Sequence, residues 1–280
     1  MTGVQTCALP ICGNKIVANE QFFTKDENIG IAYGMGITAE RVAEQWKVGR
    51  EAQDEFATES HRRALVAIEK GEFKQEITPY TLNEHVPDFA RHEVVTRSKV
   101  ISIDEGPRAG TTREVLAKLR PAFAANGSVT AGNSSQTSDG AGALIVVSEK
   151  ILKQFNLTPL ARFVSFAVKG VPPEIMGIGP KEAIPLALAR AGLKADDIGW
   201  IELNEAFAAQ ALAVIGDLGL DQSKINPLGG AIALGHPLGA TGAIRAATVV
   251  HGLRRRKLKY GMVTMCVGTG MGAAGIFEAL

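Results

Sequence analysis

The strongest constraint on the fold is an alternation of strand-like and helix-like segments that begins near Leu160 and continues to the last residues of the chain. Apolar runs bounded by turn residues predict strands at residues 161–168, 198–203, 261–267 and 274–278. Helical periodicity predicts helices at residues 181–191, 205–218 and 240–258. This order predicts an α/β fold in which helices are layered against a sheet, and it leaves parallel and antiparallel strand pairing open.

Composition and charge narrow the class of protein. The 280 residues are 46% hydrophobic and 21% charged, which is typical of a globular protein with about two domains. A formal net charge of +1 gives no electrostatic reason to expect a nucleic-acid or membrane partner. No apolar run approaches the ~18 residues of a membrane span, since even residues 206–214 are interrupted by Gln210. We therefore expect a small-molecule partner.

The cysteines indicate a reducing environment. Cys7, Cys12 and Cys266 are too few and too unevenly spaced for a disulfide framework, and no second cysteine pair accompanies the first as a zinc site would require. This usage favours a cytoplasmic location. His85 and His92 lack nearby cysteines and a helical frame, so we expect no metal site there.

The segments before Leu160 are less regular. Residues 1–12 (MTGVQTCALPIC) fit neither a signal peptide nor the elements that follow, and we interpret them as a foreign leader. One helix is predicted to begin with Thr38 as its cap, and a second helix to end at Gly71. Residues 76–95 contain prolines and mixed charges without clear periodicity, which predicts irregular structure with short strands.

Three polar residues stand where reactive groups are common in α/β proteins. The glycine- and proline-rich stretch 226–243 surrounds His236, which is the composition of a backbone bent tightly to aim one side chain. Asn204 and Cys266 lie at the ends of predicted strands. Taken singly, these residues could be a helix cap, a structural histidine and a small buried side chain. Their position on three turns that can converge favours a site.

Nucleotide-binding motifs are not supported by the glycine pattern. Gly268, Gly270 and Gly272 follow a predicted strand, but neither a helix nor a ribose-binding acidic residue follows them. The stretch GHPLGATG lacks the Gly-Lys-Ser/Thr ending of a phosphate-binding loop. Neither a dinucleotide nor a phosphate-loop function is therefore expected.

The motifs around these polar residues resemble the thiolase family, whose members form or cleave the carbon–carbon bond of 3-ketoacyl-CoA. The motifs are NEAFA at 204–208, GGAIALGHPLGATGA at 229–243 and CVGTGMGAA at 266–274. The resemblance extends upstream through GMGITAE at 34–40, LRPAF at 119–123 and VTAGNSSQTSDGAGA at 129–143. It implies an α/β fold with a layered α-β-α C-terminal domain and an α+β loop domain.

The resemblance also implies catalytic roles. The histidine matching His236 activates a nucleophilic cysteine and, with a water held by the asparagine matching Asn204, forms an oxyanion hole for the thioester oxygen. The cysteine matching Cys266 is the acid/base that moves the proton at the α-carbon of the acetyl group. The backbone N–H matching Gly268 contributes to a second oxyanion hole.

Coenzyme A or acyl-CoA is implied as substrate, with no tightly bound cofactor and no metal. The serine matching Ser135 contacts the pantetheine arm, and the arginine matching Arg108 lies by the nucleotide end. The methionines matching Met35 and Met176 line the thioester pocket. Without the resemblance, both methionines would be assigned to core packing. The family further implies a homo-oligomer, as a dimer or a tetramer.

One departure from the family pattern affects the expected activity. No residue matches the family's covalent nucleophile, a cysteine in a C-x-S-G-like motif upstream of GMGITAE. We therefore expect an N-terminally truncated thiolase that is inactive alone and associates through exposed apolar surface. The expected organisation is a leader (1–12), a CoA-binding loop domain (13–137), a remnant of the N-terminal thiolase domain (138–158) and a C-terminal thiolase domain (159–280).

Several alternatives remain open. The form GNSSQTSDG looks more like the degradative, broad-chain branch of the family than the acetoacetyl-CoA-specific acetyl-CoA acetyltransferases. A hydrolase would use Cys266 as nucleophile and His236 as base. A non-catalytic CoA-binding or oligomer-forming module would keep the pocket without the nucleophile.

Overall fold

The computed structural model describes Gln21 and residues 30–280 of the chain. Its centre is a four-stranded sheet with the strand order β3-β6-β5-β4. The strands are β3 (Ala161–Gly170), β4 (Ile198–Leu203), β5 (Tyr260–Val267) and β6 (Met271–Ala279). Strand β5 runs parallel to β4 and antiparallel to β6, and β3 runs antiparallel to β6. The predicted α/β class is confirmed, and the sheet is mixed.

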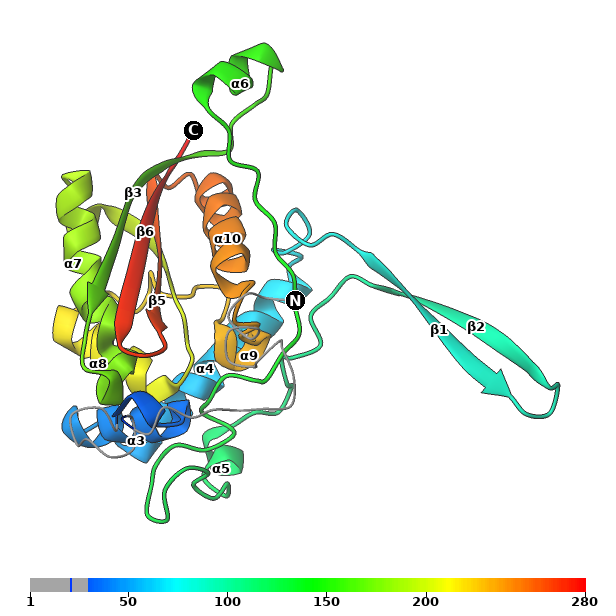
Figure 1. Cartoon of the computed structure of the whole chain (residues 1–280), viewed down its shortest axis with the longest axis horizontal. Helices are drawn as coiled ribbons and strands as arrows, with labels where there is room; N and C mark the ends of the chain where they lie inside the picture. Colours follow the sequence, from blue (N-terminus) through cyan, green and yellow to red (C-terminus); the bar gives the residue numbers. More distant parts are fainter. Residues whose placement is uncertain (1–20, 22–29) are drawn as a thin grey trace.

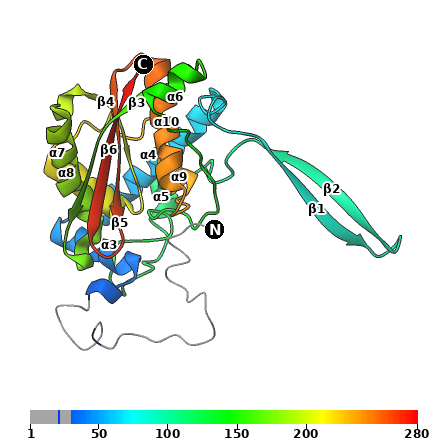
Figure 2. The ribbon, with the colours of Figure 1, turned by 45° about the horizontal axis from the view of Figure 1, so that its top comes forward.

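Helices cover both faces of this sheet. Figures 1 and 2 show α7 (Gly179–Ala191) and α8 (Ala208–Leu218) on one face and α10 (Thr241–Arg256) on the other. Consecutive residues of β4 point to opposite layers, because Trp200 packs in the cluster that contains α10 and Ile201 packs in the cluster between α7 and α8. Two apolar cores therefore hold the carboxyl ends of β4 and β5 in place.

The remaining elements lie around the sheet and at both of its ends (Figures 1 and 2). They are α3 (Met35–Gln45), α4 (Arg50–Glu69), α5 (Arg113–Leu116), α6 (Glu149–Gln154), α9 (Ala231–Leu234), and the 3-10 turns η2 (Pro173–Ile178) and η3 (Ala195–Asp197). Helix α4 packs against α8 and α9 through small buried residues such as Ala57 and Ala64. This packing places α4 beside the glycine-rich turn that carries His236. None of the helices in the described residues is long and apolar enough to cross a membrane.

The prediction of irregular structure for residues 76–95 was wrong, whereas the strands expected there are present. This region contributes to a regular antiparallel hairpin of β1 (Tyr80–Asp88) and β2 (Glu93–Ile101), which projects away from the body in Figures 1 and 2. Most residues on both faces of the hairpin are exposed. Alternation of apolar and polar residues reports one buried face, and a hairpin that is solvated on both faces lacks that signal.

Two predicted helix starts also differ. Helix α3 begins at Met35 rather than after Thr38, whose hydroxyl lies inside the helix and donates to the Met35 carbonyl at 2.7 Å. Helix α8 begins at Ala208 because Phe207 is extended and bridges to Ser134 of the preceding hydroxyl-rich segment. In the second case a contact between distant segments overrides the local helical pattern.

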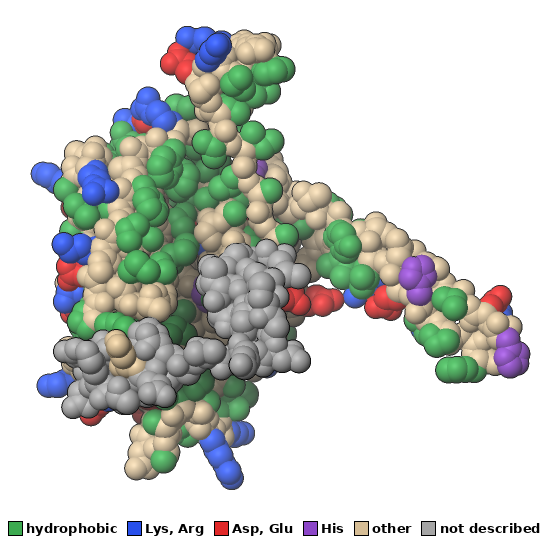
Figure 3. Space-filling model, in the orientation of Figure 1, with side chains coloured by type: hydrophobic (Ala, Val, Ile, Leu, Met, Phe, Trp, Pro, Cys, Tyr) green, Lys and Arg blue, Asp and Glu red, His purple; other side chains and the backbone are tan. Residues whose placement is uncertain are grey.

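Apolar side chains are exposed in several places, including the segment before α6 and strand β3, and the space-filling view shows such side chains gathered over the front of the molecule (Figure 3). Ile145 and Val146 in the extended segment before α6 are 91% and 85% exposed. Phe166 and Val168 lie on β3, at the edge of the sheet, where α10 covers β4, β5 and β6 instead. Such surface favours association between molecules.

We expect the purified chain to self-associate through this surface. In sedimentation velocity, the average mass should rise with concentration, and the double variant Ile145→Ser/Phe166→Ser should shift it back toward the monomer. Phe89→Ser serves as the control, because Phe89 is 83% exposed at the tip of the hairpin, away from the sheet. A concentration-independent monomer would contradict the expectation.

A buried acid predicts how stability depends on pH. Burial raises the pKa of Glu76 to about 7, with Arg255 opposing and Glu202 reinforcing the shift. The folded chain therefore binds more protons than the unfolded chain between the ordinary pKa of 4.5 and about 7. The free energy of unfolding should fall as pH rises through this window, and the loss should be complete above it.

Glu76→Gln should remove the cost of ionising a buried carboxyl group at high pH. We expect the variant to be more stable than the parent at pH 8 by on the order of 2 kcal/mol, with the difference shrinking toward pH 5. Urea unfolding at the two pH values measures the effect. Glu44→Gln changes the same chemical group at an exposed position on α3 and should show no such dependence. An equal difference for Glu76→Gln at both pH values would disprove the assignment.

Candidate active site

Two of the predicted residues lie together at the carboxyl ends of the parallel strands β4 and β5. Asn204 follows β4, and its backbone N–H donates to the Thr264 carbonyl of β5 at 2.9 Å. Cys266 lies two residues further along β5. Adjacent parallel strands end on the same side, which is where α/β folds place ligands.

The glycine-rich turn brings His236 to the same edge. A side-chain carbon at Gly230 would collide with the Glu205 carboxylate, and one at Gly235 would collide with the Ser138 hydroxyl. Gly235 also has a φ of +90°, a conformation that favours glycine. Close packing therefore requires glycine at positions 230 and 235, and Gly235 also has the kind of bent backbone that the composition predicted.

The hydrogen bonds around His236 fix its tautomer. Thr241 Oγ1 lies 2.7 Å from His236 Nδ1 and 3.0 Å from the Pro237 carbonyl. The hydroxyl has one proton, which it donates to that carbonyl, so it accepts the proton of Nδ1. Nε2 then carries no proton, and its lone pair accepts a hydrogen bond from Asn204 Nδ2 at 3.3 Å. Burial, with a smaller effect of the Arg245 charge, lowers the pKa of His236 to about 4. The imidazole is therefore neutral near pH 7.

Asn204 is held on its other sides as well. It is 1% exposed, and its carbonyl accepts a hydrogen bond from Gln210 Nε2 at 3.2 Å. Its side-chain Oδ1 is buried and has no hydrogen-bond partner among the described residues. A buried acceptor of this kind is costly unless a donor reaches it. The amide can therefore serve one further donor, such as a water or a ligand group.

Cys266 is connected to Asn204 through Gln210. The Cys266 thiol donates to Gln210 Oε1, with 3.2 Å between sulfur and oxygen. Burial raises the pKa of Cys266 to about 12, so the group is a thiol at neutral pH. Gly268 follows two residues later, and a methyl group placed on it would meet no atom within 4 Å. Packing therefore does not explain the glycine at position 268.

The residues implied in CoA binding lie around the same turns. The Ser135 N–H donates to the Ala206 carbonyl at 2.9 Å, which places the hydroxyl-rich segment beside the turn that holds Asn204. The Arg108 N–H donates to His61 Nδ1 at 3.1 Å. No hydrogen bond or ion pair joins the Arg108 guanidinium to another residue in the described part of the chain, so its charge is available to an anion.

The two methionines differ in exposure. Met35 is the first residue of α3 and is 41% exposed, whereas Met176 lies in η2 and is buried. Helix α3 packs against η2, so the two residues come from neighbouring elements. Their predicted role as pocket walls stays a prediction.

Sequence reasoning missed three residues that support the site. Thr241 fixes the imidazole, Gln210 links Cys266 to Asn204, and Glu205 anchors the glycine turn. A weak signal existed for Gln210, because it is the only polar side chain among the buried residues of α8. Thr241 is the first residue of α10, five positions after His236, but nothing in the sequence indicated that it would contact the ring.

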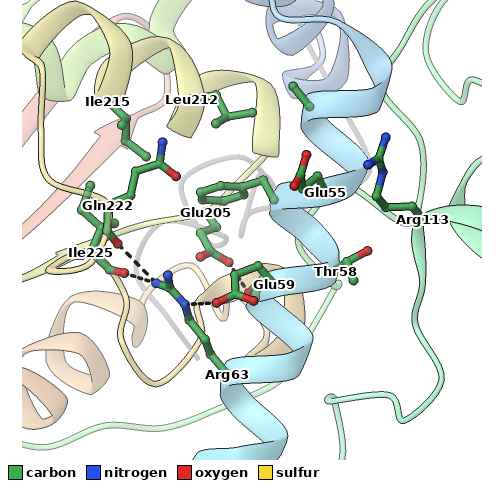
Figure 4. Close-up of a pocket in the computed structure, with 13 residues that line it drawn as sticks. Glu55, Thr58, Glu59, Arg63, Arg113, Glu205, Leu212, Ile215, Gln222 and Ile225 are labelled. Atoms are coloured by element: carbon green, nitrogen blue, oxygen red, sulfur yellow. Dashed lines mark hydrogen bonds and ion pairs between the residues drawn. The ribbon is translucent and has the colours of Figure 1, made fainter.

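A separate cavity of about 690 Å³ lies between α4, α8 and the segment before the glycine turn (Figure 4). Arg63 spans one side of it, with Nε donating to Glu59 at 2.7 Å and Nη1 donating to the Ile225 carbonyl at 2.6 Å. Glu205 also lines this cavity. None of the three predicted reactive residues does, so the cavity is distinct from the candidate site.

The layered α/β fold with an Asn–His–Cys constellation at the strand ends defines the class of protein to which the chain should be compared. The profile described as "Thiolase, N-terminal domain" matches residues 19–150, and "Thiolase, C-terminal domain" matches residues 157–279. The chain belongs to the thiolase family.

Individual relatives agree with this assignment. The chain is 54% identical to a 3-ketoacyl-CoA thiolase of Bacillus subtilis over 87% of its own length and 62% of the relative's. It is 47% identical to the peroxisomal 3-ketoacyl-CoA thiolase of Homo sapiens over 99% of its own length and 64% of the relative's. The chain thus spans less than two thirds of the length of these relatives.

Solved structures share the fold. The acetyl-CoA acetyltransferase of Bacillus anthracis has a TM-score of 0.83 and 47% identity over 88% of this chain and 60% of that one. The dimeric peroxisomal thiolase of Saccharomyces cerevisiae has a TM-score of 0.82 and 44% identity, covering 95% and 64%. A human mitochondrial 3-ketoacyl-CoA thiolase in complex with CoA has a TM-score of 0.80 and 40% identity, covering 96% and 65%. The predicted thiolase-like fold is confirmed.

The tautomer of His236 can be tested directly. We expect ¹⁵N NMR of the histidine-labelled chain at pH 7 to show a protonated Nδ1 and an unprotonated Nε2. Thr241→Val removes the acceptor for Nδ1, so it should give a mixture of tautomers and cost about 1 kcal/mol of stability. Thr241→Ser keeps the hydroxyl and should retain the parent spectrum. A parent ring protonated at Nε2 would refute the network.

Proposed function

We propose that the chain provides the CoA-binding and proton-transfer residues of an acetyl-CoA C-acyltransferase, a thiolase that forms or cleaves the carbon–carbon bond of 3-ketoacyl-CoA. The observation that carries this proposal is the unprotonated Nε2 of neutral His236, which accepts from the Asn204 amide, with the Cys266 thiol linked through Gln210 to the same asparagine. The family membership and the names of the relatives support the same reaction.

His236 acts first as a base. Its free Nε2 takes the proton of a substrate or enzyme thiol, which makes that sulfur a nucleophile. Nε2–H is then a donor. Together with a water on Asn204 Oδ1, which has no partner among the described residues, it stabilises the oxyanion of the tetrahedral thioester intermediate. The low pKa of His236 makes the acquired proton easy to pass on to a leaving thiolate.

Cys266 moves the proton at the α-carbon. When the bond between C2 and C3 of the 3-ketoacyl group breaks, its electron pair passes to the acetyl-CoA enolate. The Cys266 thiol then gives its proton to the enolate carbon, and condensation reverses this transfer. The Gly268 N–H stabilises the enolate oxygen, a role consistent with the open space around Gly268.

Coenzyme A enters as a substrate rather than as a tightly bound cofactor. Arg108 faces its nucleotide end, Ser135 contacts the pantetheine arm, and Met35 and Met176 line the acyl pocket. Support comes from the guanidinium of Arg108, which has no partner among the described residues, and from the related human structure, which is a complex with CoA. A homo-oligomer is the expected assembly, supported by the dimeric yeast relative. The cytoplasmic location stays a prediction, and a peroxisome is the alternative that the human relative's name raises.

The acyl-enzyme step needs a nucleophilic thiolate that the described residues do not provide. Cys266 is the only cysteine among them, and its thiol has a raised pKa. Cys7, Cys12 and the expected leader at 1–12 lie outside the described residues. We therefore propose that this chain alone does not turn over. The boundaries of the expected loop domain, remnant and C-terminal domain also stay predictions.

The alternative functions are less well supported. A hydrolase built on Cys266 and His236 would need the two side chains paired, whereas the thiol donates to Gln210 and His236 contacts Asn204 and Thr241. Membership of the degradative, broad-chain branch rather than the acetoacetyl-CoA-specific branch rests on the form GNSSQTSDG alone. A CoA-binding module without catalysis shares every contact described for CoA and differs only in the absence of turnover.

Two measurements test the proposal. Isothermal calorimetry should detect CoA binding, and Arg108→Ala should weaken it by about tenfold, since a charge-assisted phosphate contact is lost. Arg97→Ala on the exposed hairpin removes the same charge elsewhere and should leave binding unchanged. Thiolysis of acetoacetyl-CoA by the chain alone should stay at background. Turnover at ordinary enzymatic rates would overturn the inactivity, and absent CoA binding would overturn the assigned site.

A further inference from the structure

Gln210 occupies an unusual position for a polar side chain. It lies in α8, is 1% exposed, and its buried neighbours in the helix are alanines, Val214 and Ile215. A buried amide is costly unless both of its ends are hydrogen-bonded. Both ends of Gln210 are satisfied by the candidate site, since Oε1 accepts from the Cys266 thiol and Nε2 donates to the Asn204 carbonyl.

We infer that Gln210 is a positioning residue that fixes the Cys266 thiol relative to Asn204 and holds Cys266 in its protonated form. The chemical meaning of this role rests on the proposed function, in which Cys266 is the acid and Asn204 belongs to the oxyanion hole. The contacts themselves are independent of that function.

The orientation of the amide explains why Gln210 favours the thiol. A backbone carbonyl can only accept hydrogen bonds, so the Asn204 carbonyl requires the NH₂ group of Gln210 on its side. The amide therefore cannot flip without placing two oxygens against each other. Oε1 must face Cys266, where it accepts from S–H but would repel the lone pairs of a thiolate.

Packing behind the side chain restricts it further. A side-chain carbon at Gly177 of η2 would come within 2.8 Å of Gln210 Cβ, so η2 lies directly against the base of this side chain. The Cβ of Gln210 is therefore held by packing between α8 and η2. Its amide has one allowed orientation, and its two hydrogen-bond partners come from different segments. A side chain held in this way can fix the position of the Cys266 thiol through its hydrogen bond.

Alkylation of Cys266 by iodoacetamide as a function of pH tests this inference. The full chain carrying Cys7→Ser and Cys12→Ser leaves Cys266 as the single thiol. Gln210→Glu keeps an oxygen at the same place and adds negative charge, so the alkylation rate near pH 9 should fall about tenfold for each unit by which the thiol pKa rises. Gln210→Met presents no oxygen to the sulfur and should shift the pH profile toward lower pH.

Gln53→Met is the matched control, because Gln53 is also fully buried and hydrogen-bonded, to the Val48 carbonyl and the Ser128 hydroxyl of another region. It should lower the melting temperature and leave the pH profile of Cys266 unchanged. If both Gln210 variants lower the melting temperature but retain the parent profile, Gln210 is a structural residue only and the inference fails.

A measurement on the unsubstituted glutamine covers the case in which the Gln210 variants do not fold. The Raman S–H stretch of Cys266 in the Cys7→Ser/Cys12→Ser chain should appear at the lowered frequency of a hydrogen-bonded thiol. A band at the frequency of a free thiol would overturn the inference. Neither readout requires turnover or CoA, so failure here is distinguishable from failure of the proposed thiolase function.

Discussion

The Glu205 carboxylate joins the segments on which the candidate site depends. It accepts hydrogen bonds from Ser60 of α4 at 2.6 Å, from Asn226 at 2.7 Å and from the Ile232 N–H of α9 at 3.2 Å. Burial raises its pKa, and the hydrogen bonds from Ser60 and Asn226 oppose that shift. Because this carboxylate is fully buried and has three donors, it holds together the turn after β4, helix α4 and the glycine-rich turn.

Beside this anchor, a separate hydrogen-bonded series extends through the reactive residues. Thr241 orients the His236 ring, His236 accepts from Asn204, and the Asn204 carbonyl is joined through Gln210 to the Cys266 thiol. Each residue in the series has its donor and acceptor roles set by its neighbour. Burial then separates the two titrating groups, because it lowers the pKa of the imidazole and raises that of the thiol. Near neutral pH the His236 imidazole is therefore an unprotonated base and the Cys266 thiol is a protonated acid, both at the same end of the sheet.

Much of the architecture could be predicted from local pattern. The strands at 198–203, 261–267 and 274–278 were placed within three residues of β4, β5 and β6, since apolar runs report burial directly. The region of the hairpin β1–β2 is predicted only as irregular structure with short strands, because neither face of the hairpin is buried against the body. Helix α8 starts late because its first residues bridge to the hydroxyl-rich segment, a contact that spans more than 70 positions of sequence.

The sequence by itself determined the α/β class, the three turns that carry Asn204, His236 and Cys266, and the family to which they belong. Only the tertiary structure decided the strand pairing, the tautomer of His236 and the supporting roles of Thr241 and Gln210. The physical reason is that periodicity encodes which face of an element is buried, whereas hydrogen bonds between buried polar groups depend on which distant segments meet. Gln210 makes the difference plain, because its sequence context is that of an apolar helix and its partners lie on two other segments.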